Sequence, residues 1–156
     1  MNLAHVHLLL NHIPPLGVLF GLLLLAAGLL RKSGDLVRAA LVTFVLVALA
    51  AIPTYYPGGP AEKIVEGMPG VSEMAIMDHE ESAEASFIAA LVLGALSCFK
   101  LFFYRRRETP RSIAVATLVL ALVVTGMMAW TAHLGGLVRH PEISGGAAVT
   151  SPAEKD

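Results

Sequence analysis

Charged residues are scarce in this chain and are missing from four long stretches of it. Only 15% of the 156 residues are Asp, Glu, Lys or Arg, whereas a typical soluble domain has about 25%. A helix needs about 20 mainly apolar residues to cross the hydrocarbon core of a bilayer, which is the length scale of these stretches. The uncharged stretches are residues 1–30, 39–61, 85–99 and 112–138.

These stretches predict the fold class. In lipid every backbone polar group needs a partner within the protein, so membrane spans should be helices. The third stretch is the shortest, but Lys100 can extend its charge to the interface, and residues 101–104 (LFFY) add an aromatic belt. We therefore expect residues 1–143 to form an all-α integral membrane four-helix bundle, followed by a disordered tail at 144–156. The expected spans are about 8–30, 36–56, 80–104 and 112–138.

Cysteine occurs once, as Cys98 in the third expected span. A single cysteine cannot build a disulfide framework, and the chain has no CxxCH motif for covalent attachment of haem. It also has no phosphate-binding loop and no visible pairing of a nucleophile with a base. We therefore expect neither a classical hydrolase or transferase nor a nucleic-acid partner, and an electron carrier or accessory subunit fits better than a stand-alone enzyme.

Positive charge is concentrated in two short connections. Eight of the eleven Lys and Arg residues lie in residues 31–38 and 100–111, and ten of the twelve acidic residues lie elsewhere. Short loops rich in Lys and Arg stay on the cytoplasmic side of a membrane. The charges thus predict a multi-pass protein of the cell (inner) membrane, N-out and C-out, with cytoplasmic loops at 31–38 and 100–111.

The segment between the second and third spans, residues 53–74, is rich in Pro and Gly and should contain turns rather than a second domain. Asp78 and Glu81 form a D-x-x-E pattern that fits a capping box for the third helix, with Ser72 as a competing start. Gly17 and Gly21 form a GxxxG motif, which favours close approach of helices. No long internal repeat is visible.

All six histidines fall on the predicted outer side. His5 and His12 are seven residues apart, so they lie nearly on one face of a helix, and His133 and His140 have the same spacing. Because neighbouring helices run antiparallel, His12 and His133 should share a deeper layer, with His79 near the same level. The histidines of the three spans are His5, His7 and His12, then His79, then His133 and His140.

Small residues lie next to the histidines along two spans, on the side toward the middle of the membrane. Such residues either let helices touch or leave a slot for a flat cofactor. Each histidine also has a structural interpretation at the membrane interface, and the nearby acids, residues 80, 81 and 84, fit a solvated helix start. The small residues are Ala83, Ser86, Ala90 and Gly94 in the third span, and Gly126 and Ala129 in the fourth.

Two motifs resemble a known family. HLLLNHIPPLG (7–17) is similar to the H-P-x-x-x-H-F-P-I opening of the small bacterial membrane proteins called the domain of unknown function 2231 family. TAHLGGLVRHPEI (131–143) resembles that family's closing T-G-H-x-G-G-x-L-V-x-x-H-G pattern, and a histidine opening the third span also fits. The resemblance covers residues 3–143. It implies haem or metal ligation at the family positions, which are His7, His12, His79, His133 and His140.

The chain departs from the family at Val6, Pro15 and Pro141, where the family has Pro, an aliphatic residue and Gly. The resemblance also leaves His5 as an extra histidine and pairs His7 with His12, whereas helical geometry pairs His5 with His12. We follow the motif, because the residues before Pro15 need not be helical.

Three functions fit these observations. The leading prediction is a b-type haem protein that transfers electrons near the extracytoplasmic face, with haem b held by His12 or His79 together with His133. His7 with His140 is a candidate second pair. One alternative is a Cu or Zn site at His12, His79 and His133. Another is a non-catalytic subunit of a larger respiratory complex. Expected partners are the lipid bilayer and an extracytoplasmic redox protein or respiratory subunits, and a homo-oligomer is left open.

Overall fold

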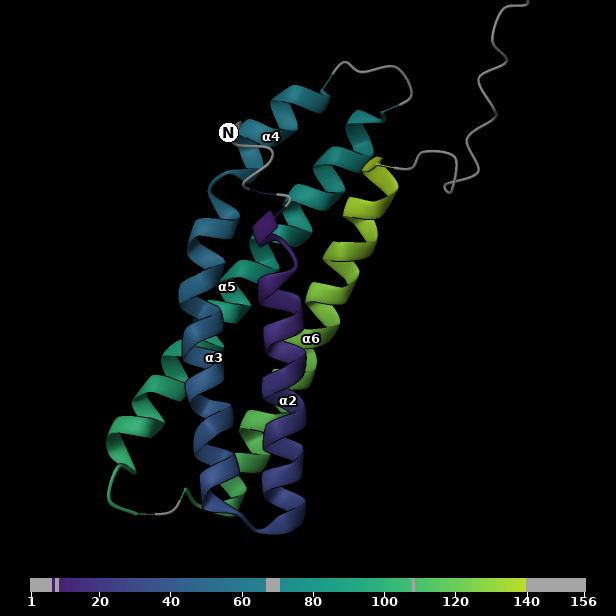
Figure 1. Cartoon of the computed structure of the whole chain (residues 1–156). Helices are drawn as coiled ribbons and strands as arrows, with labels where there is room; N and C mark the ends of the chain where they lie inside the picture. Colours follow the sequence, from purple (N-terminus) through teal and green to yellow (C-terminus); the bar gives the residue numbers. More distant parts are fainter. Residues whose placement is uncertain (1–6, 8, 67–70, 108, 140–156) are drawn as a thin grey trace, which may run out of the picture.

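The computed structural model describes residues 7, 9–66, 71–107 and 109–139. Within this part of the chain every regular element is a helix. Four of its helices are long and one is short. Figure 1 shows the long helices side by side in an elongated bundle, with the short helix α4 at the upper end. The helices are α2 (Ile13–Arg31), α3 (Gly34–Tyr55), α4 (Gly58–Val65), α5 (Glu73–Phe103) and α6 (Arg111–Arg139).

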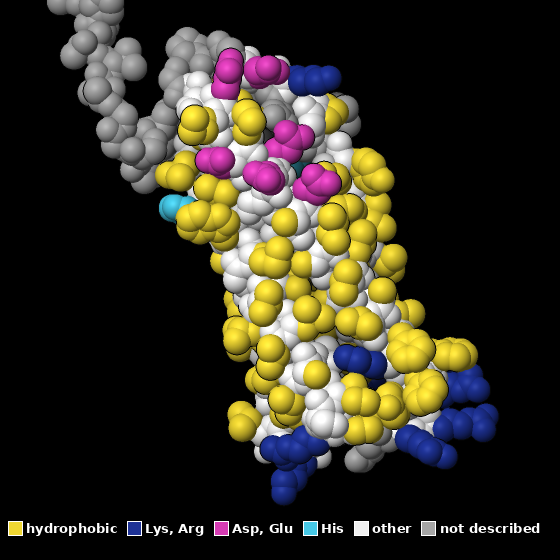
Figure 2. Space-filling model, turned by 180° about the vertical axis from the view of Figure 1, so that it is seen from behind, with side chains coloured by type: hydrophobic (Ala, Val, Ile, Leu, Met, Phe, Trp, Pro, Cys, Tyr) yellow, Lys and Arg dark blue, Asp and Glu magenta, His cyan; other side chains and the backbone are white. Residues whose placement is uncertain are grey.

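The surface of the bundle has the character of a membrane protein. The four long helices are each long and apolar enough to cross a bilayer. Figure 2 shows apolar side chains around the middle of the molecule, acidic side chains toward the upper end and Lys and Arg at the lower end. Leu23, Leu46 and Leu122, for example, are about 60% exposed, an exposure that is costly in water but favourable in hydrocarbon. The all-helical fold with four candidate membrane spans is thus confirmed.

The first membrane helix begins five residues later than predicted. Asn11 and His12 form a turn, and α2 begins at Ile13 with Pro14 and Pro15 in its first turn. Proline is tolerated there because the first N–H groups of a helix have no intrahelical partner. The turn separates His7 from the body of α2, so spacing along one regular helix does not apply across it.

The third membrane helix begins earlier than predicted. Its N-cap is Ser72, and α5 therefore starts at Glu73, so the capping box at Asp78 is a wrong prediction. The intervening residues 73–77 (EMAIM) contain no Gly or Pro that would stop a helix from extending back to Ser72. Segment 53–74 also holds more than turns, because α4 lies within it.

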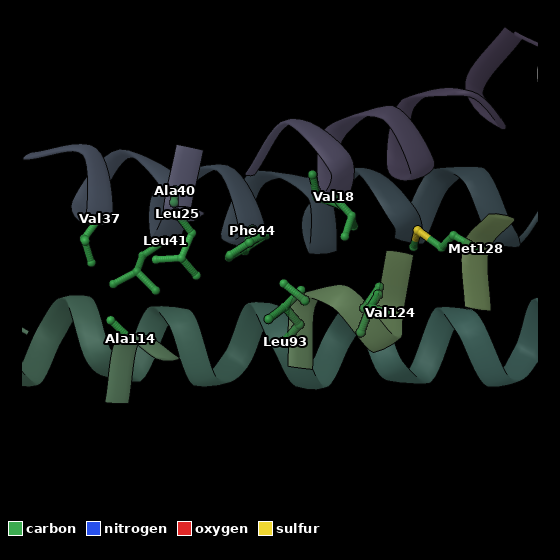
Figure 3. Packing of buried hydrophobic residues seen from close by; sticks show 13 residues of the cluster. Val18, Leu25, Val37, Ala40, Leu41, Phe44, Leu93, Ala114, Val124 and Met128 are labelled. Atoms are coloured by element: carbon green, nitrogen blue, oxygen red, sulfur yellow. The ribbon is translucent and has the colours of Figure 1, made fainter. Parts of the chain in front are cut away.

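The four long helices form a closed ring. α2 packs on α3, α3 on α5, α5 on α6, and α6 on α2, so α2 lies diagonally opposite α5. Their inward side chains meet in one apolar core, which includes Val18, Leu25, Phe44, Leu93 and Val124 (Figure 3). Phe44 is 1% exposed and is the largest of the fully buried side chains.

Glycines bring neighbouring helices close together. A β-carbon at Gly21 would lie 2.5 Å from Cε1 of Phe44, so the GxxxG motif of α2 serves packing against α3. A β-carbon at Gly94 would meet Cβ of Ala48, so the small residues of α5 also let helices touch and do not leave a slot there. A β-carbon at Gly126 would have no heavy atom within 4 Å, and Gly126 is exposed, which places the α6 stripe outside the bundle.

The two helical hairpins, α2–α3 and α5–α6, repeat one another. Four of the five positions that are buried in α2 are buried again 72 residues later in α5, and five of the eight that are buried in α3 are buried again 77 residues later in α6. In the first helices the pairs are Pro14 and Ser86, Val18 and Ala90, Gly21 and Leu93, and Leu25 and Ser97. In the second helices they are Val37 and Ala114, Ala40 and Thr117, Phe44 and Ala121, Val47 and Val124, and Ala51 and Met128.

This structural repeat is a repeat of buried positions and is compatible with the absence of a visible repeat in the sequence. Parallel repeats of this kind are common in membrane proteins and relate the halves by a twofold axis along the membrane normal. The ring of contacts fits such an axis, because exchanging the two hairpins maps the α3–α5 contact onto the α6–α2 contact.

Candidate functional site

The upper end of the bundle holds the ring of His7 against α3. Its Nδ1 lies 3.1 Å from the main-chain oxygen of Thr54. A carbonyl oxygen can only accept, so Nδ1 carries the hydrogen and donates it, and in the neutral ring the lone pair is on Nε2. One turn further along the chain, a β-carbon at Gly58 would lie 3.5 Å from Cε1 of His7. The ring therefore packs directly on the backbone where α4 begins.

The ring of His79 is held on α6 in the same way. Its Nδ1 lies 3.1 Å from the main-chain oxygen of Thr131, which again makes Nδ1 the donor and leaves the lone pair on Nε2. A β-carbon at Gly135 would lie 2.9 Å from Cε1 of His79, closer than real side chains approach. Glycine at this position thus makes room for the imidazole.

The hydroxyl groups of Thr54 and Thr131 also make equivalent contacts in the two hairpins. Oγ1 of Thr54 lies 2.8 Å from the oxygen of Ala50 and 3.4 Å from that of Leu10, which is three residues after His7. In the same way, Oγ1 of Thr131 lies 3.1 Å from the oxygen of Met127 and 3.0 Å from that of Ser82, which is three residues after His79.

Each hairpin therefore contains one unit made of a histidine near the start of its first helix and a T-x-x-x-G segment near the end of its second. The first segment is Thr54–Gly58 and the second Thr131–Gly135. His79 lies 72 residues after His7, as in the core positions of α2 and α5. Thr131 and Gly135 lie 77 residues after Thr54 and Gly58, as in the core positions of α3 and α6. The two histidines are thus equivalent residues of the structural repeat.

The second unit has a larger polar cluster than the first. The hydroxyl groups of Ser82 and Ser86 lie 2.7 Å and 2.8 Å from Oγ1 of Thr131. Ser86 is only 4% exposed, so its hydroxyl group depends on this partner. The first unit has Pro14 at the position equivalent to Ser86. The cluster fixes α5 to α6 directly below the ring of His79.

The two imidazoles occupy one region of the bundle. Both are partly buried, the ring of His7 against α3 and the ring of His79 against α6. Tyr55 of α3 stacks on Phe87 of α5, with ring centroids 4.4 Å apart and an interplanar angle of 2°, and so ties the two units together. Within the described part of the chain neither Nε2 makes a hydrogen bond.

One more polar group at this end is unsatisfied. Oδ1 of Asn11 is buried and has no hydrogen-bond partner among the described residues. Asn11 lies one turn after His7, and its backbone N–H donates to the oxygen of His7 at 2.9 Å. A buried acceptor without a donor is costly unless something else supplies the donor.

The other predicted ligands lie apart from this pair. His12 and His133 are exposed, and the ring of His133 lies beside that of the exposed Trp130, with centroids 5.5 Å apart. The structure thus does not bring His12, His79 and His133 together. Among the described residues no group of three or more His, Cys, Asp or Glu side chains could hold a metal ion. His5 and His140 lie outside the described residues.

Sequence reasoning placed His7 and His79 among the candidates but did not pair them. A signal for the pairing was present, because T-x-x-x-G occurs once near the end of the second span and once near the end of the fourth. No family model, curated protein or solved structure matches the chain, so the resemblance of its histidine motifs to the domain of unknown function 2231 family stays a prediction.

Proposed function

We propose that the chain is a b-type haem protein of a membrane, in which the imidazoles of His7 and His79 would hold one haem. The observation that carries this proposal is the repeated unit. In each hairpin a main-chain carbonyl accepts the Nδ1–H of the histidine and leaves Nε2 with its lone pair. Histidines that bind metals usually donate their second ring N–H in this way, which fixes the ring and raises its basicity.

The number of donors favours haem over the other metals. Haem iron takes two axial ligands from the protein, and two neutral imidazoles from different helices supply them. Zinc sites take three or four protein ligands, and no group of three potential ligands occurs among the described residues.

Haem would supply reversible one-electron exchange at this end of the bundle. The chain's own residues would set the conditions for it. The carbonyl groups of Thr54 and Thr131 orient the two rings, and Gly58 and Gly135 leave space for them. The positive-inside rule assigns the upper end to the extracytoplasmic side. This assignment favours exchange with a redox protein there or with a neighbouring subunit of a respiratory complex.

Absorption spectra of protein purified in detergent after expression with ample haem test the proposal. We expect a Soret band and, after reduction, the sharp bands of low-spin iron. His7→Ala and His79→Ala should each abolish the low-spin bands, because each removes one axial ligand. His133→Ala is the matched control, since this histidine is exposed and its ring lies beside that of Trp130. A colourless wild-type protein, or equal losses in all three variants, would overturn the proposal.

A second variant separates ligation from folding. Gly135→Ala keeps both histidines but places a methyl group 2.9 Å from Cε1 of His79, so the ring must move. We expect this variant to remain folded and helical but to bind haem more weakly. Gly136→Ala is its control, because nothing lies within 4 Å of a β-carbon there. Equal haem affinity in the two variants would remove His79 from the site.

A further inference from the structure

A second site lies at the opposite end of the molecule. Between the start of α3 and the end of α5 the structure has an open cavity of about 420 Å³. Of its described lining residues five are cationic and one, Asp35, is acidic. Figure 2 shows Lys and Arg gathered at this lower end, next to the apolar surface. The cationic lining residues are Arg38, Lys100, Arg105, Arg106 and Arg107.

The structural repeat shows where the two hairpins differ at this end of the bundle. Gly28 and Lys100 are equivalent positions of α2 and α5. At Gly28 the first hairpin is tightly closed, since a β-carbon there would lie 2.9 Å from the backbone nitrogen of Val37. In the second hairpin Lys100 occupies this position, and its Nζ donates to Oγ1 of Thr117 in α6. An ammonium group thus lies among the helix ends where the first hairpin has direct helix contact.

Two of these cations, Arg38 and Lys100, are held in place by hydrogen bonds. A guanidinium nitrogen of Arg38 donates to the main-chain oxygen of Arg105 at 3.0 Å, which links α3 to the connection after α5. Lys100 is partly buried, whereas the other four are exposed. Phe99, Phe102 and Phe103 on the same end of α5 are each more than 60% exposed, as expected for side chains in the interfacial region of a bilayer.

A smaller cavity of about 120 Å³ adjoins the first. The two share Gly34 and Thr109, and the smaller one adds the cations Lys32 and Arg111. The two cavities together form a basic concave surface that extends from α5 across the start of α3 to the start of α6.

We propose that this basic cavity binds the phosphate group of an anionic phospholipid. Arg and Lys around a cavity at the end of membrane helices are suited to lipid phosphates, and the guanidinium group can bind a phosphate with two hydrogen bonds. The neighbouring phenylalanines place the cavity at the depth of lipid headgroups rather than in open water. A phospholipid therefore satisfies both surfaces, with its phosphate in the cavity and its acyl chains along α5.

Thermal unfolding and native mass spectrometry of the detergent-purified protein test this proposal. The probes are phosphatidylglycerol, phosphatidylcholine and inorganic phosphate. We expect retention and stabilisation with phosphatidylglycerol only. Arg38→Gln and Lys100→Gln should each weaken binding by about fivefold or more, because one cation near an anionic lipid contributes a factor of about that size. Arg31→Gln is the matched control, since Arg31 is exposed at the same end but lines neither cavity.

The outcomes are distinct. Equal weakening by Arg38→Gln and Arg31→Gln would mean that overall positive charge, not the cavity, attracts the lipid, and would overturn the proposal. Equal stabilisation by phosphatidylcholine would also overturn it, as would full stabilisation by inorganic phosphate alone, which would assign the cavity to a free anion. Arg38 is exposed, so its variant is expected to fold even if Lys100→Gln does not.

Discussion

The hydroxyl group of Thr131 offers the sharpest test of the packing described above. Thr131→Val keeps the shape of the side chain but removes Oγ1, which lies within 3.1 Å of four polar atoms. A hydroxyl group has one hydrogen and two lone pairs, so it can make at most three of these bonds at once. The substitution therefore removes one donated and up to two accepted hydrogen bonds between α5 and α6 or within α6.

The expected cost follows from those bonds. Hydrogen bonds between membrane helices contribute about 0.6 kcal/mol each on average and up to about 1.7. The buried hydroxyl of Ser86 also loses its partner on α6, which costs about 1–3 kcal/mol unless it finds another. We expect Thr131→Val to lower the free energy of unfolding by about 1–3 kcal/mol.

The repeat supplies a matched comparison. Thr54 is the equivalent residue, but the one hydrogen bond that its hydroxyl group makes outside α3 among the described residues is the 3.4 Å approach of Oγ1 to the oxygen of Leu10. Thr54→Val should therefore cost less than about 1 kcal/mol. Thr43→Val is a further control, because among the described residues the hydroxyl group of Thr43 bonds the carbonyl of Ala39 in its own helix and no other helix.

Equilibrium unfolding in mixed micelles measures these differences, with the fluorescence of the single tryptophan, Trp130, as the probe beside Thr131. The Ser86→Ala/Thr131→Val double-mutant cycle should give a coupling energy of at least about 0.5 kcal/mol, because the two hydroxyl groups bond one another. A loss in Thr131→Val no larger than that in Thr54→Val, together with zero coupling, would refute the reasoning.

Two further predictions concern packing and orientation. Gly94→Ala should destabilise the bundle by about 1–3 kcal/mol, since its methyl group would meet Cβ of Ala48. Gly126→Ala should be neutral or stabilising, because its surroundings are open. Unfolding measurements on both variants check this, and equal effects would contradict the close α3–α5 contact. In a background without the native cysteine, Ser72→Cys should react with an impermeant thiol reagent applied outside intact cells, and Ser112→Cys only after lysis, because the positive-inside rule places them on opposite sides; the reverse pattern would contradict the N-out orientation.

The sequence was sufficient for the helices because their signal is local. The uncharged stretches determine where a chain can cross hydrocarbon, and each one coincides with a long helix. The helix starts were harder to predict because capping motifs compete. Ser72 prevailed over Asp78 since the residues between them are all compatible with a helix.

The pairing of histidines could not be predicted because it depends on where each ring points. The turn at Asn11 and His12 sends His7 toward Thr54 and leaves His12 exposed, which no regular helical spacing anticipates. The structural repeat was hidden for a different reason. Equivalent buried positions hold residues of different size and polarity, such as Leu25 and Ser97, so the two halves show no visible similarity in sequence.

The central claim is that His7 and His79 hold one guest between the two halves of the chain. The most direct measurement is the electron paramagnetic resonance spectrum of the oxidised, haem-loaded protein, compared with that of His79→Gly before and after addition of imidazole. The account predicts low-spin iron in the wild type, high-spin iron in the variant and a return to low spin with imidazole. Low-spin iron in the variant without imidazole, or a wild-type protein that binds no haem, would contradict it.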